Sequence, residues 1–132
     1  MSHSLNAHQI GQLRSTLRAR AAQLREEIRQ TLLKSDQEQY TMIADQVRDL
    51  EDDSFADLMV DVNLAEIDRD LQELRLIDVA MLRMGDGSYG SCEECGQPID
   101  IERLHATPFA SRCFECQSSF ERTHYQETGH TL

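Results

Sequence analysis

The chain has 132 residues, and its 24 acidic against 13 basic side chains give a formal net charge of −11. This length allows one compact domain, or one elongated element with a small domain beside it. No apolar run reaches the ~18 residues that a membrane span requires, so no membrane association is expected. The acidic balance argues against a partner bound through nucleic-acid phosphates and suits a partner with a basic surface. Because the chain has no tryptophan and 5% aromatic residues, we expect an elongated helical protein rather than a large globular core.

A long stretch without glycine or proline covers most of the chain, from Gln12 to Met84. It is rich in Leu, Ala, Glu, Gln and Arg, a composition that favours helix. Apolar residues recur in both halves at the three- and four-residue spacing of a coiled-coil stripe: Ile10, Leu17, Ala21, Leu24 and Ile28, then Val60, Leu64, Ile67, Leu71, Leu74 and Met81. One unbroken helix of ~110 Å would leave both stripes in water unless it dimerised.

An antiparallel hairpin buries one stripe against the other within a single chain. Its midpoint falls near Arg48, where the apolar pattern weakens. We therefore predict a first helix at 5–45, a tip at 46–53 and a second helix at 54–84, in a monomeric protein. The turn contains no glycine or proline, so a parallel dimeric coiled coil remains the alternative. The cluster Gly85-Asp86-Gly87-Ser88 is expected to end the second helix as a glycine cap.

The expected tip is strongly acidic, with six acids and one arginine between Asp45 and Asp57. One interpretation is a solvated turn, because acids at the start of the second helix interact favourably with its dipole, by about 0.3–1 kcal/mol each. That does not account for Asp49, which falls at the end of the first helix, where the dipole disfavours an acid. The other interpretation is a tip whose carboxylates are presented to a partner.

Two Cys-x-x-Cys pairs, separated by seventeen residues, contain all the cysteines of the chain: Cys92, Cys95, Cys113 and Cys116. This spacing is a strong signature of a tetrathiolate zinc site. Two disulfides or a redox-active pair are the alternatives; no signal peptide is recognised, so a reducing, cytoplasmic location is expected and disulfides are disfavoured. Four thiolates leave no open coordination position, so we predict one structural zinc ion.

No constellation in the sequence implies a reaction, so the chain is not expected to be an enzyme. The segment 89–116 has five acids against two arginines, and therefore lacks the basic face of a nucleic-acid-binding finger. A short helix is expected from Phe114 to Gln126. The five histidines are scattered without ligand spacing and are interpreted as non-catalytic: His3, His8, His105, His124 and His130.

The finger residues carry a resemblance to a known family. The pattern comprises Tyr89-Gly90-x-Cys92-x-x-Cys95-Gly96, Ile99, Arg103-Leu104-x-Ala106-x-Pro108-x-Ala110 and Cys113-x-x-Cys116. It resembles the DksA/TraR family of bacterial transcription regulators, and with the preceding hairpin the resemblance extends over roughly residues 12–125. It implies a coiled-coil hairpin joined to a C4 zinc finger. It also implies binding to RNA polymerase rather than DNA, with the hairpin tip inserted into the secondary channel toward the active site.

The resemblance also assigns residues to the tip. The family motif Asp-x-x-Asp-x-Ala corresponds here to Asp49, Asp52 and Ser54. Both acids are present, and serine replaces the alanine. This correspondence favours the interpretation of Asp49 and Asp52 as a functional tip. Serine is small and is also a good N-cap, so the departure is mild.

A second departure concerns guanosine tetraphosphate (ppGpp), the nucleotide of the stringent response. In members that respond to it, basic residues on the finger and on the second helix help to form a nucleotide site with polymerase. This chain has Thr107 and Gln117 at the finger positions. Of the two helix positions, Arg69 is basic, but Leu76 stands where a lysine is expected. The resemblance therefore implies regulation that depends weakly on ppGpp or is independent of it.

The predicted organisation is mostly α. A helical hairpin at 1–88 carries an acidic tip near 46–54, and a zinc-finger domain with a C-terminal helix and tail occupies 89–132. The predicted function is non-enzymatic regulation of transcription initiation through RNA polymerase. Two alternatives remain: a Gre-like secondary-channel factor that aids transcript cleavage, and a stress adaptor that uses the finger as a thiol and zinc switch.

Overall fold

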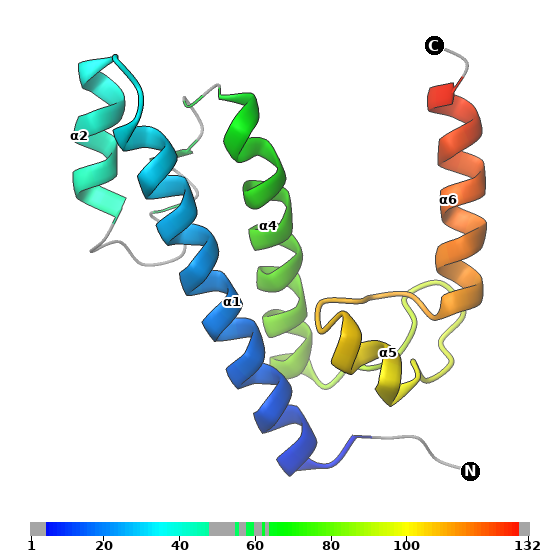
Figure 1. Cartoon of the computed structure of the whole chain (residues 1–132). Helices are drawn as coiled ribbons and strands as arrows, with labels where there is room; N and C mark the ends of the chain where they lie inside the picture. The colour runs from blue at the N-terminus through cyan, green and yellow to red at the C-terminus, as the bar shows by residue number, and fades with distance from the viewer. Residues whose placement is uncertain (1–4, 48–54, 56–57, 60–61, 63, 130–132) are drawn as a thin grey trace. The chain divides into compact units, whose positions relative to one another are not determined.

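The computed structural model describes residues 5–47, 55, 58–59, 62 and 64–129 (Figure 1). The chain divides into two compact units, one made of Met1–Leu17 with Leu76–Leu132 and the other of Arg18–Arg75. The helices are α1 (Ala7–Leu33), α2 (Glu38–Val47), α4 (Ala65–Asp86), α5 (Ile101–Ala106) and α6 (Phe114–Gly129). Pairing between extended segments in the described residues is limited to one isolated bridge, Ser91 with Pro98. The prediction of a mostly helical chain is confirmed. None of the described helices is both long and apolar enough to cross a membrane.

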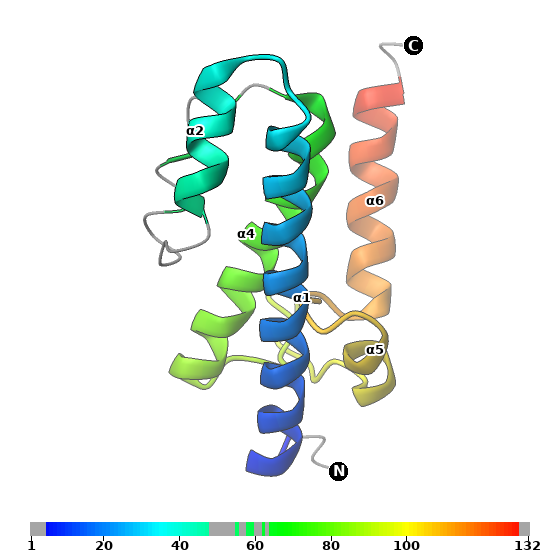
Figure 2. The ribbon, with the colours of Figure 1, turned by 60° about the vertical axis from the view of Figure 1, so that its left-hand side comes forward.

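The unit Arg18–Arg75 is built on an intrachain hairpin. Here α1 and α4 lie side by side and run in opposite directions (Figures 1 and 2). Arg20 of α1 forms a two-pronged ion pair with Glu73 of α4, at 2.6 and 3.0 Å. The apolar stripes form the core between the helices: Ala21, Leu24, Ile28 and Leu32 on α1, and Ile67, Leu71 and Leu74 on α4. The predicted antiparallel hairpin is confirmed.

The prediction of one continuous helix over 5–45 is wrong, because the first helix ends at Leu33. The segment 34–37 is a turn, after which α2 runs back beside α1 (Figure 2). The N–H of Gln37 donates to the hydroxyl of Ser35 (3.2 Å), and the N–H of Ser35 donates to the carbonyl of Leu32 (3.2 Å). A serine side chain that bonds to the backbone competes with helical hydrogen bonding, so the helix ends without glycine or proline. Tyr40, Ala44 and Val47 are the buried residues of α2.

The second helix also starts later than predicted, at Ala65 rather than at 54. Before it, Phe55 and Met59 are helical and buried. The Val62 N–H closes a turn onto the Met59 carbonyl at 3.1 Å. Asp and Asn flank Val62 in the sequence, and both favour turns and caps over helix interiors. The predicted tip residues Asp49, Asp52 and Ser54 lie outside the described residues.

The other unit combines the start of α1, the end of α4 and everything that follows. Asn6 and Gln9 form a reciprocal capping box at the start of α1, with bonds of 2.8 and 2.9 Å. Gly87, with φ of +87°, ends α4 in the left-handed conformation that favours glycine, which confirms the expected cap. Arg83 then donates from its guanidinium to the carbonyls of Ser88 and Ser91, so the last turn of α4 is bonded directly to the finger.

The finger has a small core of its own, made of Tyr89, Ile99, Leu104 and Ala110. The hydroxyl of Tyr89 donates to the carbonyl of Pro108 at 2.8 Å. Burial raises the pKa of this phenol to about 12, so it stays a hydrogen-bond donor over the physiological pH range. Gly90 has φ of +89°, and a Cβ there would lie 3.1 Å from Leu5. The segment before α1 therefore packs closely on the finger.

Removing the charge of Asp70 or of Glu73, two acids on α4, should change the stability of the hairpin in opposite directions. Burial, followed by a hydrogen bond with Glu27, raises the pKa of Asp70, whereas the bond from Arg20 lowers the pKa of Glu73. The folded state therefore disfavours the ionised form of Asp70, so this residue lowers the free energy of unfolding once the pH rises above its unfolded-state pKa. The folded state favours the ionised form of Glu73, so the stability that Glu73 contributes is lost as the pH falls through its folded-state pKa. We expect Asp70→Asn to raise the free energy of unfolding at pH 7 and Glu73→Gln to lower it, each by under about 1 kcal/mol.

Urea denaturation followed by circular dichroism at pH 7 and pH 3.5 measures both effects. The two differences should shrink at the lower pH, because protonation removes the charges that the substitutions remove. Equal signs for the two variants at pH 7 would contradict this account of the hairpin.

Candidate metal centre

The first cysteine pair lies in a tight turn after the isolated bridge. The N–H of Cys92 donates to the Gln97 carbonyl at 2.8 Å, and the N–H of Gly96 donates to the Cys92 carbonyl at 2.9 Å. Gly96 has φ of +77°, a conformation that residues with a Cβ rarely adopt. The glycine after Cys95 thus lets the chain turn back immediately, and the turn brings both thiols of the pair to one side.

The second pair is positioned by the start of α6. The backbone N–H of Cys116 points to the sulfur of Cys113 at 3.5 Å, and the N–H of Gln117 donates to the Cys113 carbonyl at 2.9 Å. Within the first helical turn, residues three apart in sequence lie on one face. The two turns are joined by a backbone bond of 2.8 Å from the Glu93 N–H to the Ser111 carbonyl.

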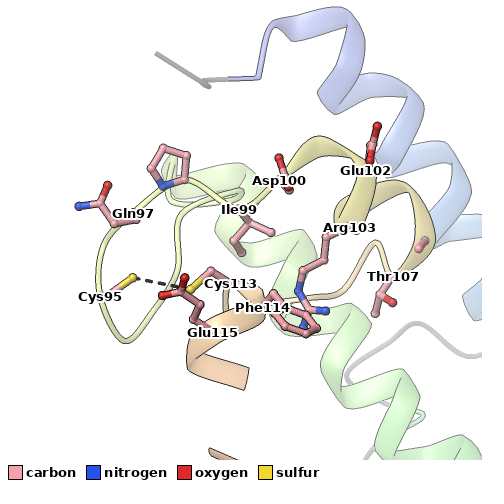
Figure 3. A pocket seen from close by; sticks show the side chains of 12 residues that line it. Cys95, Gln97, Ile99, Asp100, Glu102, Arg103, Thr107, Cys113, Phe114 and Glu115 are labelled. Carbon is pink, nitrogen blue, oxygen red and sulfur yellow. Dashed lines mark hydrogen bonds between the residues drawn. The ribbon is translucent and has the colours of Figure 1, made fainter. Parts of the chain in front are cut away.

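The four thiols fit a zinc ion. Their sulfur atoms all lie within 4.8 Å of one another, and those of Cys95 and Cys113 are 3.9 Å apart (Figure 3). A tetrahedron with Zn–S bonds of ~2.3 Å places its sulfurs ~3.8 Å apart, so only small adjustments separate this cluster from ideal coordination. The four cysteines form a C4 zinc-finger site, and they are the only such cluster of potential ligands among the described residues. With four sulfur ligands, the zinc supplies structural stability rather than a reactive position.

The backbone around Cys92 favours its thiolate. Burial raises the pKa of this thiol, but hydrogen bonds from the N–H groups of Cys113, Cys95 and Glu94 outweigh burial and lower the pKa to about 6. At Cys116 the neighbouring thiols act in the opposite direction: hydrogen bonding with Cys113 and then Cys92 raises its pKa. Without a cation, the four groups therefore resist complete deprotonation. Zinc removes this conflict because its charge stabilises every thiolate.

Two arginines, for which the sequence predicts no structural role, connect segments of the finger through side-chain contacts. Arg112 places one guanidinium nitrogen 3.0 Å from Glu93, and its Nε lies 3.4 Å from Glu94, at ion-pair distance. Its guanidinium carbon lies 3.9 Å from the ring centre of Phe120 on α6. Arg112 thus joins the first cysteine turn to α6 through two carboxylates and a cation–π contact. Arg103 of α5 donates to the Arg112 carbonyl at 3.0 Å.

A sequence signal for Arg112 was available but weak. It stands directly before Cys113, and two acids occupy the interior of the first cysteine pair. Only the fold shows that these charges meet. These contacts leave the Arg112 side chain 18% exposed and already engaged, so it is poorly placed to replace the missing basic residues of a nucleotide site.

The other positions considered for nucleotide binding are exposed or neutral. Leu76 is 45% exposed on α4, and Thr107 is half-buried after α5. The Gln117 amide donates to Glu121 at 2.9 Å. Arg69 borders a cleft in the other unit together with Lys34 and four acids: Glu26, Glu27, Glu66 and Asp70.

The fold and the site define a C4 zinc-finger protein that carries an α-helical hairpin. Residues 87–122 match the family described as prokaryotic dksA/traR C4-type zinc finger. The RNA polymerase-binding transcription factor DksA of Caulobacter vibrioides is 32% identical over 120 residues, which cover 89% of this chain and 80% of that protein. The protein of the same name from Escherichia coli is 28% identical over 125 residues, which cover 95% of this chain and 80% of that protein. The chain therefore belongs to the DksA/TraR family, as the resemblance indicated.

Other similarities are more local or concern the fold. General stress protein 16O of Bacillus subtilis is 45% identical over 65 residues, which are 49% of this chain and 39% of that protein. The solution structure of DnaK suppressor protein from Agrobacterium tumefaciens matches with a TM-score of 0.58 and 27% identity, covering 90% of this chain and 97% of that one. The structure of DksA2 from Pseudomonas aeruginosa matches with a TM-score of 0.59 and 22% identity, covering 90% of this chain and 88% of that one. At this identity it supports the fold alone. The two DksA relatives are named as transcription factors, and membership of this family makes the chain non-enzymatic, as predicted.

Loss of one thiolate should unfold the finger selectively. We expect Cys113→Ser to lower bound zinc well below one ion per chain, because apparent zinc-binding energies of ~10–16 kcal/mol in comparable peptides depend on the full ligand set. Helicity of the hairpin should remain. Elemental analysis and amide hydrogen exchange measure the two effects, with the exposed Ser119→Ala on the same helix as control. A finger that stays protected without stoichiometric zinc would contradict the assignment.

Proposed function

We propose that this protein is a non-enzymatic regulator of bacterial transcription initiation that binds RNA polymerase through the secondary channel. The observation that carries the proposal is the combination of an antiparallel hairpin with a C4 finger in a chain that is 32% identical to a polymerase-binding factor across 80% of its length. The proposed site of action is the cytoplasm, where RNA polymerase works. The protein acts there as a monomer, because the hairpin buries its apolar stripes within one chain.

Direct DNA binding is not part of this function. A finger that binds DNA needs free cations to neutralise phosphates. Here Arg103 donates to a backbone carbonyl and Arg112 is engaged by two carboxylates. The net charge of −11 works against a polyanion and favours basic protein surfaces.

The tip of the proposed mechanism comprises Asp49, Asp52 and Ser54. The support is the correspondence to the family motif, together with the acidic excess between Asp45 and Asp57. An elongated helical hairpin can carry carboxylates into a narrow channel that a globular surface would not enter. Inside the channel, these carboxylates act on basic groups or bound metal of polymerase through charge and change its conformation without chemistry.

The second part of the proposal is weak or absent dependence on ppGpp. A nucleotide with several phosphate charges needs cations that offset desolvation and provide charge-assisted hydrogen bonds. Three positions that are basic in responsive members are neutral here: Leu76, Thr107 and Gln117. Each missing charged hydrogen bond removes about 1.5–3 kcal/mol, so two together weaken binding by about a hundredfold or more.

Neutralising the tip should separate binding from regulation. We expect the double variant Asp49→Asn/Asp52→Asn to bind polymerase core enzyme as the unmodified protein does, since the contact area lies along the hairpin and finger. Its effect on initiation at a sensitive promoter should fall at least about tenfold, while stability changes by under about 1 kcal/mol. Ser54→Ala, which restores the alanine of the family motif, should keep or strengthen activity.

Polymerase pull-down and transcription in vitro provide the two measurements. The matched control is Glu66→Gln/Asp68→Asn, which removes the same charge from exposed positions at the start of α4. The tip assignment is wrong if the tip variant regulates the promoter as well as this control does.

Adding back cations should create the nucleotide response. We expect the unmodified protein to regulate initiation equally with and without ppGpp, using a polymerase that lacks any other site for the nucleotide. Leu76→Lys/Gln117→Lys should then increase the response to ppGpp by about tenfold or more, because two charged hydrogen bonds become available. The control is Val79→Lys, at a neighbouring exposed position of α4. Strong synergy between the unmodified protein and ppGpp would refute this part of the proposal.

A further inference from the structure

A groove runs along the finger between α5 and the start of α6. We call it the finger groove and define it by Pro98, Ile99, Asp100, Glu102, Phe114 and Glu115 (Figure 3). Its volume is about 780 Å³, within the range of cavities that hold ligands or peptide side chains. Zinc coordination and the hairpin contacts described above do not use these six side chains.

Phe114 gives the finger groove an apolar wall. Its side chain is 71% exposed although it stands between two zinc ligands, at the first position of α6. Phenylalanine is not needed there for the turn, because the interior of a Cys-x-x-Cys pair accepts polar residues, as Glu93 and Glu94 demonstrate in the first pair. Pro98 is exposed in the same lining, so the ring is not an isolated surface residue, whereas Ile99 is 1% exposed and belongs to the finger core.

The rim of the finger groove is acidic and unpaired. Asp100 and Glu102 lie on the α5 side, and Glu115 follows Phe114 at the start of α6 (Figure 3). Within the described part of the chain, none of these three side chains has a hydrogen bond or ion pair, whereas Glu93 and Glu94 are both paired with Arg112. The only basic residue in the lining is Arg103, which donates to the Arg112 carbonyl. A zinc ion with four thiolates adds further negative charge next to the groove.

From this combination of an apolar wall and an unpaired acidic rim, we propose that the finger groove binds a basic, amphipathic segment of a partner protein. The apolar side chains of that segment pack on Phe114, and its arginines or lysines pair with the three carboxylates. Nucleic acid and anionic ligands are repelled by the same charges. A small polyamine would satisfy the rim but leave the aromatic wall in water, so the lining favours a peptide. This inference does not depend on polymerase binding.

The test uses the full-length, zinc-loaded protein and a synthetic probe. The probe is a short fluorescent peptide with arginines and leucines on one helical face, and fluorescence anisotropy measures its Kd. Two matched peptides separate the contributions: one has serine in place of leucine, and the other has neutral citrulline in place of arginine. Both should bind at least about tenfold more weakly, because each loses one of the two complementary features.

Variants of the protein locate the binding. Phe114→Ala should weaken binding about tenfold, whereas Leu82→Ala, which removes a similarly exposed apolar side chain outside the groove, should leave it unchanged. Glu102→Gln/Glu115→Gln should weaken binding about fivefold, and Glu38→Gln/Asp45→Asn on α2 should not. Zinc content is measured for each variant, and Phe114→Leu provides a second probe of the wall if alanine disturbs the metal site.

Three results would overturn the proposal. Equal loss of affinity in the groove and α2 charge variants would mean that the peptide responds to net charge alone. Equal binding of the serine-substituted peptide would mean that Phe114 makes no apolar contact. Absence of binding at low salt would exclude the site. Amide chemical-shift changes confined to residues 97–107 and 113–115 would support it, and because no polymerase is present, the outcome is separate from that of the proposed function.

Discussion

Four thiolates within 4.8 Å of one another repel one another unless a cation lies among them, and this constraint governs the whole finger. The backbone prepares for the metal by directing N–H groups at Cys92, which holds the pKa of that thiol near 6, while neighbouring thiols raise the pKa of Cys116. The segments 92–95 and 113–116 are separated by seventeen residues, and Phe114, their one large apolar side chain, is 71% exposed. Zinc therefore supplies the energy that a core this small does not provide.

Closing the metal site also determines which charged side chains of the finger are paired. Once the first cysteine turn is closed, Glu93 and Glu94 converge on Arg112, whose guanidinium covers Phe120 of α6. That engagement removes the most central cation of the finger from phosphate binding. Asp100, Glu102 and Glu115, which line the finger groove with Phe114, have no such partner.

The hairpin depends on different physics. Its residues Leu24, Ile28 and Ile67 are fully buried, and burial of this apolar stripe supplies most of the favourable free energy. Arg20 and Glu73 add orientation between the helices more than net stability, because exposed ion pairs contribute little. A hairpin stabilised by its own core does not need the finger in order to remain helical. The hairpin and the finger therefore do not depend on one source of stability.

Local patterns in the sequence determined the zinc ligands, the helical class, the pairing of the two apolar stripes and the glycine cap at Gly87, since each depends on spacing over a few residues or turns. The family resemblance rested on the same local patterns. Only the tertiary structure decided where α1 ends, because the bond from Gln37 to Ser35 competes with helix in a stretch that has helical composition. It also decided the roles of Arg112 and Phe114. Both residues stand beside Cys113, yet one is enclosed by acids distant in sequence and the other faces solvent, and such long-range placement follows from the packed chain rather than from neighbouring residues.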